Sequence, residues 1–141
     1  MAAVSAGIGA CMDGLDGLVA RETGRKSVFG AILDSTCDRF TEIVLVLGLL
    51  LWYVADSRFV LAGTIGCFAA VTGSLMVSYV RARCEGAGVS CTGGIMQRPE
   101  RIVLFIAGLL CGPVIMLWLL GVVAALSYGT AIGRLWRARK A

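Results

Sequence analysis

The sequence contains no histidine, and only 16% of its 141 residues are charged. Soluble domains carry about a quarter charged residues. The low charge, the 58% hydrophobic content and the mean hydropathy of +0.86 therefore indicate an integral membrane protein of one domain. None of the six cysteines forms a Cys-x-x-Cys spacing, and without histidine a zinc site is not expected. We interpret the cysteines as small apolar residues.

The start of the chain lacks the features of a signal peptide. The first twelve residues, MAAVSAGIGACM, are small and apolar, with neither a basic start nor a cleavage site before a polar mature chain. They are also too few to cross a bilayer, which takes about 20 residues. We interpret them as the last part of a helix.

Hydrophobic blocks separated by short polar segments predict an all-α polytopic membrane protein. We expect about four full transmembrane helices, over residues 27–54, 59–80, 98–112 and 114–135, plus an N-terminal stub. The last two are separated at Gly112-Pro113, because proline cannot continue a helix cleanly. One kinked helix is the alternative there.

Basic residues orient these spans. Lysine and arginine favour the cytoplasmic side of short loops. With residues 13–39 inside, Arg58 is the only one of thirteen basic residues that falls outside. The basic C-terminal residues are interpreted as topology signals and lipid headgroup contacts; they are Arg134, Arg137, Arg139 and Lys140.

Four aspartates stand in DGLDGLVARETGRKSVFGAILDSTCD, residues 13–38. Asp34 and Asp38 are four apart and share a helix face, as do Asp13 and Asp16 at a spacing of three. Converging carboxylates repel one another unless a cation neutralises them, and oxygen-only ligands suit Mg²⁺ or Mn²⁺. With the Arg21 fork suited to phosphate, the stretch predicts metal-assisted phosphate chemistry at the membrane surface. The alternative is a set of interfacial charges.

The stretch contains the complete pattern D-x-x-D-G-x-x-A-R-(x8)-G-x-x-x-D-x-x-x-D and resembles the CDP-alcohol phosphotransferases over essentially the whole chain. The resemblance implies a six-helix bundle, a homodimer and two Mg²⁺ (or Mn²⁺) ions. It implies Asp38 as the catalytic general base. The implied metal ligands are Asp13, Asp16, Asp34 and Asp38, and the implied CDP-lipid-binding residues are Gly17, Ala20, Arg21, Ser27 and Gly30.

A second stretch, SYVRARCEGAGVSCTGGIMQRPER at 78–101, is similar to the branch that makes phosphatidylinositol phosphate or archaetidylinositol phosphate. Gln97 stands where that branch usually has glutamate. The predicted acceptor phosphate-binding residues are Ser78, Arg81, Arg83 and Arg101, followed by Arg98. The alternative is that these arginines only mark a cytoplasmic loop.

The resemblance implies an enzyme of phospholipid synthesis. It would transfer a phosphatidyl-type group from CDP-diacylglycerol or CDP-archaeol to a phosphorylated polyol, inositol phosphate, and release CMP. Glycerol phosphate as acceptor, a non-catalytic truncated membrane subunit and a small cation transporter are the alternatives. We expect a multi-pass protein of the cell (plasma) membrane, with its active site at the cytoplasmic face, in contact with membrane lipids and with no nucleic acid partner.

One departure concerns the N-terminus. The family pattern expects one membrane helix and most of another before the first aspartate, whereas only twelve residues precede Asp13. We therefore expect a single membrane domain over residues 1–141 that is truncated at its N-terminus relative to the family.

Overall fold

The computed structural model describes residues 28–91, 93, 94, 96 and 98–139. These residues form four helices, α2 (Val28–Ala55), α3 (Val60–Gly86), α4 (Arg98–Cys111) and α5 (Pro113–Ala138). The four predicted segments are confirmed as helices, to within a few residues at most of their ends. The exception is α3, which continues past the expected end at residue 80 into the stretch predicted as a loop.

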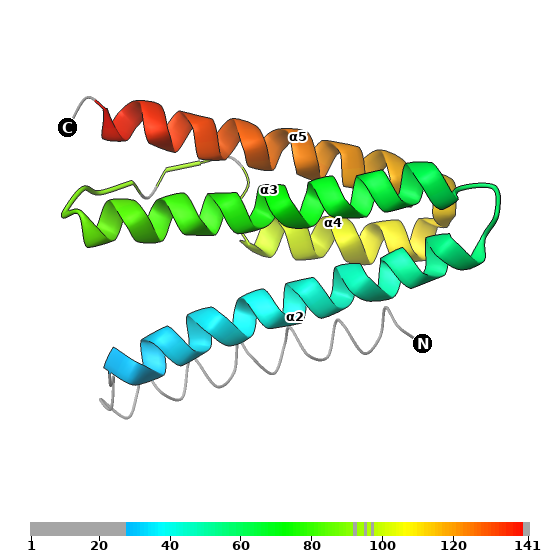
Figure 1. Cartoon of the computed structure of the whole chain (residues 1–141), viewed down its shortest axis with the longest axis horizontal. Helices are drawn as coiled ribbons and strands as arrows, with labels where there is room; N and C mark the ends of the chain where they lie inside the picture. Colours follow the sequence, from blue (N-terminus) through cyan, green and yellow to red (C-terminus); the bar gives the residue numbers. More distant parts are fainter. Residues whose placement is uncertain (1–27, 92, 95, 97, 140–141) are drawn as a thin grey trace.

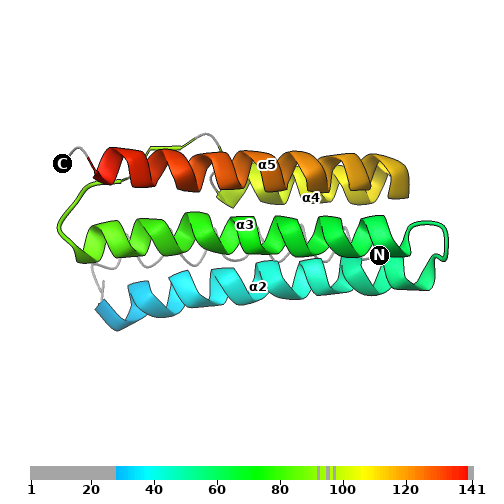
Figure 2. The same ribbon diagram turned by 45° about the horizontal axis from the view of Figure 1, so that its top comes forward.

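The helices form a bundle in which both tight turns lie at one end (Figure 1). α2 and α3 run antiparallel and are joined at residues 56–59, while α4 and α5 are joined at Gly112. The described residues between α3 and α4, which are 87–91, 93, 94 and 96, run back beside the bundle, so α4 begins near the middle of α3 (Figure 1). Figure 2 shows α4 and α5 together on one side of α3, with α2 on the other. We name the end with the two turns the turn end and the opposite half the open end.

The apolar core lies toward the turn end, and all four helices contribute to it. Its buried members are Val46, Leu49 and Tyr53 of α2, Cys67 and Ala70 of α3, Phe105 of α4, and Met116, Leu120 and Val123 of α5. The three α2 residues recur at spacings of three and four, which places them on one helix face. The open end has a smaller cluster from α3, α5 and the segment between α3 and α4.

Tyr53 closes the turn end. Its hydroxyl donates a hydrogen bond to the carbonyl oxygen of Pro113 at 2.7 Å. Its ring lies so close to Gly63 that any Cβ at that position would overlap it. Gly112, between α4 and α5, has φ +96°, a value that favours glycine. The predicted break between two helices at Gly112-Pro113 is therefore confirmed.

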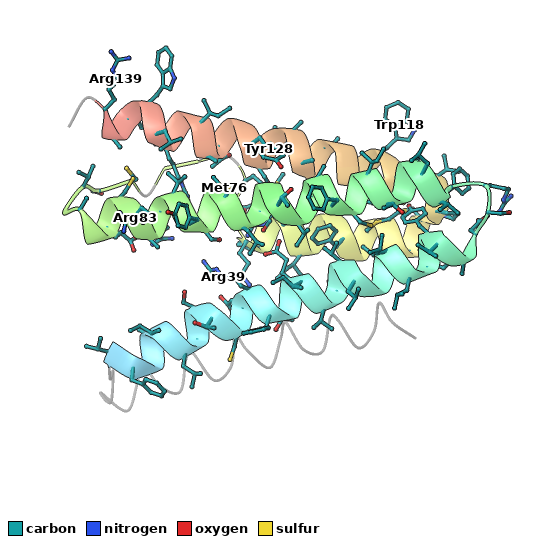
Figure 3. All side chains as sticks on the ribbon, viewed as in Figure 1. Arg39, Met76, Arg83, Trp118, Tyr128 and Arg139 are labelled. Carbon is teal, nitrogen blue, oxygen red and sulfur yellow. The ribbon has the colours of Figure 1, made fainter. Side chains whose placement is uncertain are left out.

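The outer surface suits a lipid environment. Within the described residues, two helices are long and apolar enough to cross a membrane, α3 and α5, with mean hydropathies of 1.9 and 2.0. α4 has 14 residues, fewer than the roughly 20 that span a bilayer. Large apolar side chains are exposed around the bundle, among them Trp118 at 76% (Figure 3), Leu61 and Phe68. The all-α membrane fold expected from the sequence is confirmed.

Candidate functional site

The acidic face of α2 continues into its core-facing side. Asp34, Asp38, Glu42 and Val46 follow one another at intervals of four, so they lie along one face of the helix. The solvent exposure of these side chains falls from Asp34 to Val46. Asp34 is exposed, the Asp38 side chain is 15% exposed, and Glu42 and Val46 are buried. The two aspartates predicted as metal ligands therefore stand where this face leaves the packed bundle.

Asp38 is held by arginines. Arg98, the first residue of α4, places Nη1 2.5 Å from Oδ1 of Asp38. Arg39 Nη1 lies 3.8 Å from Oδ2 and donates a hydrogen bond to the carbonyl oxygen of Ser35 at 2.7 Å (Figure 3). From the sequence, Arg98 was named as an acceptor candidate only after four other residues. In the structure it pairs with Asp38, the predicted general base.

Arg101 has a partner that the sequence did not predict. Its Nε and Nη2 donate to the two carboxylate oxygens of Glu42 at 2.9 and 3.3 Å. Ser74 of α3 donates its hydroxyl hydrogen to Oε1 of the same carboxylate at 2.7 Å. All three side chains are buried. Helices α2, α3 and α4 thus meet in one buried polar contact.

Ser78 and Arg81 lie on the last turns of α3. Ser78 falls inside the predicted helix, whereas Arg81 lies on a helix where a loop was expected. Because α2 and α3 are antiparallel and Glu42 meets Ser74, Ser78 lies level with Asp38, one turn along. Arg81 shares the face of Ser78 and forms an exposed pair with Glu85, Nε to Oε1 at 2.8 Å. These two acceptor candidates are therefore brought to the level of the aspartates.

Arg83 lies on another face of α3 than Ser78, because five residues turn a helix by about 140° beyond one full turn. Its side chain is exposed near the end of the helix (Figure 3). Ser78 and Arg81 therefore share one face of α3, and Arg83 does not lie on that face.

Arg134 of α5 is buried, with 2% of its surface exposed. Its Nη1 donates to the carbonyl oxygen of Val77 at 2.7 Å and its Nε to that of Gly93 at 3.0 Å. Among the residues described, no carboxylate pairs with it. The interpretation of Arg134 as a headgroup contact is wrong, because the side chain faces the bundle interior. Arg134 follows Ser127 by seven residues and Thr130 by four, and both of these residues are buried. This helical spacing was the signal in the sequence that Arg134 faces the interior.

Gly30, predicted to bind the CDP-lipid, lies exposed on the first turn of α2. The remaining predicted site residues lie outside the described residues; they are Asp13, Asp16, Gly17, Ala20, Arg21 and Ser27. In the part of the chain that is described, no three histidine, cysteine, aspartate or glutamate side chains gather as a metal site. Asp34 and Asp38 nevertheless fit as two members of a larger ligand set. They offer hard oxygen donors one turn apart on one face.

Asp38 and Glu42 of α2 thus pair with Arg98 and Arg101 of α4 in a helical membrane bundle. Arginine is common where proteins recognise phosphate. The model of the CDP-alcohol phosphatidyltransferase family matches residues 1–136. The chain belongs to this family, as its motif indicated.

Two curated relatives belong to the predicted branch. The chain is 41% identical over 128 residues to an archaetidylinositol phosphate synthase of Methanothermobacter thermautotrophicus, covering 88% of this chain and 62% of the relative. It is 36% identical over 137 residues to a phosphatidylinositol phosphate synthase of Mycobacterium marinum, covering 88% and 57%. The chain therefore spans about three fifths of the length of these relatives.

Solved structures of the Mycobacterium tuberculosis phosphatidylinositol phosphate synthase have the same fold. The structure with CDP-DAG bound matches with a TM-score of 0.82 and 32% identity, over 92% of this chain and 68% of that one. The complex with manganese and citrate matches with a TM-score of 0.80 and 31% identity, over 92% and 65%.

Proposed function

We propose that the chain transfers a phosphatidyl-type group from a CDP-lipid, CDP-diacylglycerol or CDP-archaeol, to a hydroxyl of inositol phosphate and releases CMP. Family membership and the two named relatives support the reaction class. The observation that carries the proposal is the Asp38–Arg98 pair at the border between the acidic face of α2 and the arginines of the open end. A base for the hydroxyl and cations for a phosphate lie side by side there.

The proposed metal ligands are Asp13, Asp16, Asp34 and Asp38, binding two Mg²⁺ or Mn²⁺ ions. The manganese complex of the M. tuberculosis enzyme supports this assignment. Bound divalent ions would offset the diphosphate charge and stabilise the leaving group. The CDP part would be bound by Gly17, Ala20, Arg21, Ser27 and Gly30.

Asp38 is the proposed general base. A base must lie within hydrogen-bond reach of the proton that it accepts. The contact from Arg98 to Oδ1 fixes how the carboxylate is turned. Asp38 would take the proton of the acceptor hydroxyl as its oxygen attacks the phosphorus next to the lipid, while the bond from that phosphorus to CMP breaks.

The acceptor phosphate is proposed to bind Ser78, Arg81, Arg83 and Arg101, with buried Arg134 beside them. A phosphate dianion requires several cations, and arginine hydrogen bonds to phosphate are strong. Within the described ranges no acidic side chain pairs with Arg83 or Arg134, so no described carboxylate offsets their charges. Glycerol phosphate carries a similar phosphate and remains the rival acceptor.

The setting of the enzyme is also a proposal. The arginines of the open end favour its placement at the cytoplasmic face of the cell membrane. The exposed apolar side chains of α3 and α5 would contact membrane lipids. The homodimer implied by the family would cover part of the same apolar surface.

The test is CMP release from labelled CDP-lipid by membranes containing the full chain with Mg²⁺ and inositol phosphate. Release that requires both inositol phosphate and Mg²⁺ is expected, and a chelator should abolish it. A preference for glycerol phosphate in a parallel reaction would change the acceptor assignment. No release with either acceptor would favour the non-catalytic subunit.

A further inference from the structure

Glu42 is buried inside a membrane bundle and belongs to neither the metal motif nor the acceptor residues. Its side chain is 6% exposed, that of its partner Arg101 is 3% exposed, and their closest contact is 2.9 Å. Charge inside a membrane protein is costly and usually functional. A buried ion pair often stabilises a fold no better than apolar residues of similar volume would. Fold stability alone therefore does not explain why a charged residue is buried at position 42.

The pair belongs to a chain of hydrogen bonds that crosses all four described helices. Ser74 of α3 donates to Glu42 of α2, and Arg101 of α4 donates to the same carboxylate. Arg101 Nη1 also donates to the carbonyl oxygen of Met96 at 3.4 Å, and the Met96 amide donates to Thr130 Oγ1 of α5 at 3.4 Å. This chain connects the start of α4 to the other three helices.

The pair also stands directly beside the proposed base. Glu42 follows Asp38 by four residues on α2, and Arg101 follows Arg98 by three on α4, so Asp38–Arg98 and Glu42–Arg101 are consecutive contacts between the same two helices. The backbone of α4 packs mainly on α5, while α2 packs on α3. Two-point contact between a guanidinium and a carboxylate fixes orientation as well as distance. It can set the register of α4 against α2.

We propose that Glu42 is a positioning residue: by holding Arg101, it sets the first turn of α4 so that Arg98 meets Asp38 and orients its carboxylate. This inference rests on the proposed function. Glu42 would touch neither the substrate nor the metal. It acts through Arg101 and Arg98.

The decisive variant replaces both charges by apolar residues, Glu42→Leu with Arg101→Met, in the full chain. Such a replacement is expected to keep or raise the melting temperature, because no unpaired charge is left buried. Mn²⁺ affinity, measured by electron paramagnetic resonance, should fall about 10-fold, the lower end of the effect of residues that support metal ligands. Arg101 is not a proposed metal ligand, so this readout reports on Asp38.

Two further variants separate position from stability. Ser74→Ala keeps the ion pair and should lower Mn²⁺ affinity less than the double change does. Tyr53→Phe removes a hydrogen bond at the turn end and should lower the melting temperature while leaving Mn²⁺ affinity and the acceptor KM unchanged.

The inference is overturned if the double variant binds Mn²⁺ as tightly as the wild type while the wild type releases CMP. The same result with a lower melting temperature would make Glu42 purely structural. A wild type that neither binds Mn²⁺ nor releases CMP would overturn the proposed function, and this inference with it.

Discussion

The two ends of the bundle are built by different physical means. At the turn end the helices are joined by apolar packing, one tyrosine hydrogen bond and two tight turns, and the charged side chains described there are Asp56 and Arg58. At the open end the apolar cluster is small, and buried arginines connect the helices instead. Asp38, Arg101 and Arg134 all belong to that half.

The difference indicates that the turn end mainly stabilises the fold, whereas the open end mainly serves the proposed chemistry. Apolar packing contributes free energy of folding without demanding a particular direction. Charged contacts in a membrane are costly and directional, and they occur where a ligand or a reaction needs them. Substitutions at the turn end should therefore change stability, and those at the open end should change activity.

The largest expected difference in the rate of CMP release comes from replacing one aspartate by asparagine at each end. Asp38→Asn should lower the rate of CMP release by about 10²- to 10⁴-fold, the contribution of a general base. Asp56→Asn, the matched control, should leave the rate unchanged. The measurement is CMP release at saturating inositol phosphate. An Asp38→Asn protein with the rate of the wild type would remove the catalytic assignment and the contrast between the ends.

Arg134→Gln is expected to have the next largest effect. A hydrogen bond to a charged group contributes about 1.5–3 kcal/mol, so the acceptor KM should rise about 10-fold or more. Arg139→Gln changes an exposed arginine at the same end (Figure 3) and serves as the control. If Arg134→Gln lowers only the melting temperature and leaves the acceptor KM unchanged, Arg134 supports the fold and not the acceptor.

The turn end was largely predictable from the sequence, and much of the open end was not. Apolar blocks and Gly112-Pro113 give the helices and their ends because burial and helix geometry act locally. The aspartate spacing likewise predicted the shared face of Asp34 and Asp38. The Glu42–Arg101 pair could not be predicted, because its partners are 59 residues apart and meet only through the register of α2 against α4. Arg134 was misread because its place in a basic tail suggested headgroup contact, although it follows Ser127 and Thr130 at helical spacing.

A third prediction concerns packing at the turn end. Gly63→Ala would place a methyl group against the Tyr53 ring. Overpacking of this kind costs about 1–3 kcal/mol, so the free energy of unfolding in detergent should fall by that amount while the acceptor KM stays constant. Gly121→Ala is the control, since a Cβ there meets no atom within 4 Å. A changed acceptor KM in Gly63→Ala would show that the two ends are coupled.

The smallest expected effect is the pH dependence of the turn-end ion pair. Arg58 donates from Nε and Nη2 to the Asp56 carboxylate at 3.1 and 3.0 Å, and these hydrogen bonds lower the pKa of Asp56 from 3.8. A depressed carboxyl pKa stabilises the fold above the unfolded value, and that contribution is lost as the pH falls through the folded value. Asp56→Asn should thus melt slightly below the wild type at pH 7, and the gap should close as the pH falls below 3.8 and through the folded-state pKa. A gap that stays constant over this range would mean that the exposed pair contributes nothing through its charge, leaving packing alone to hold the turn end together.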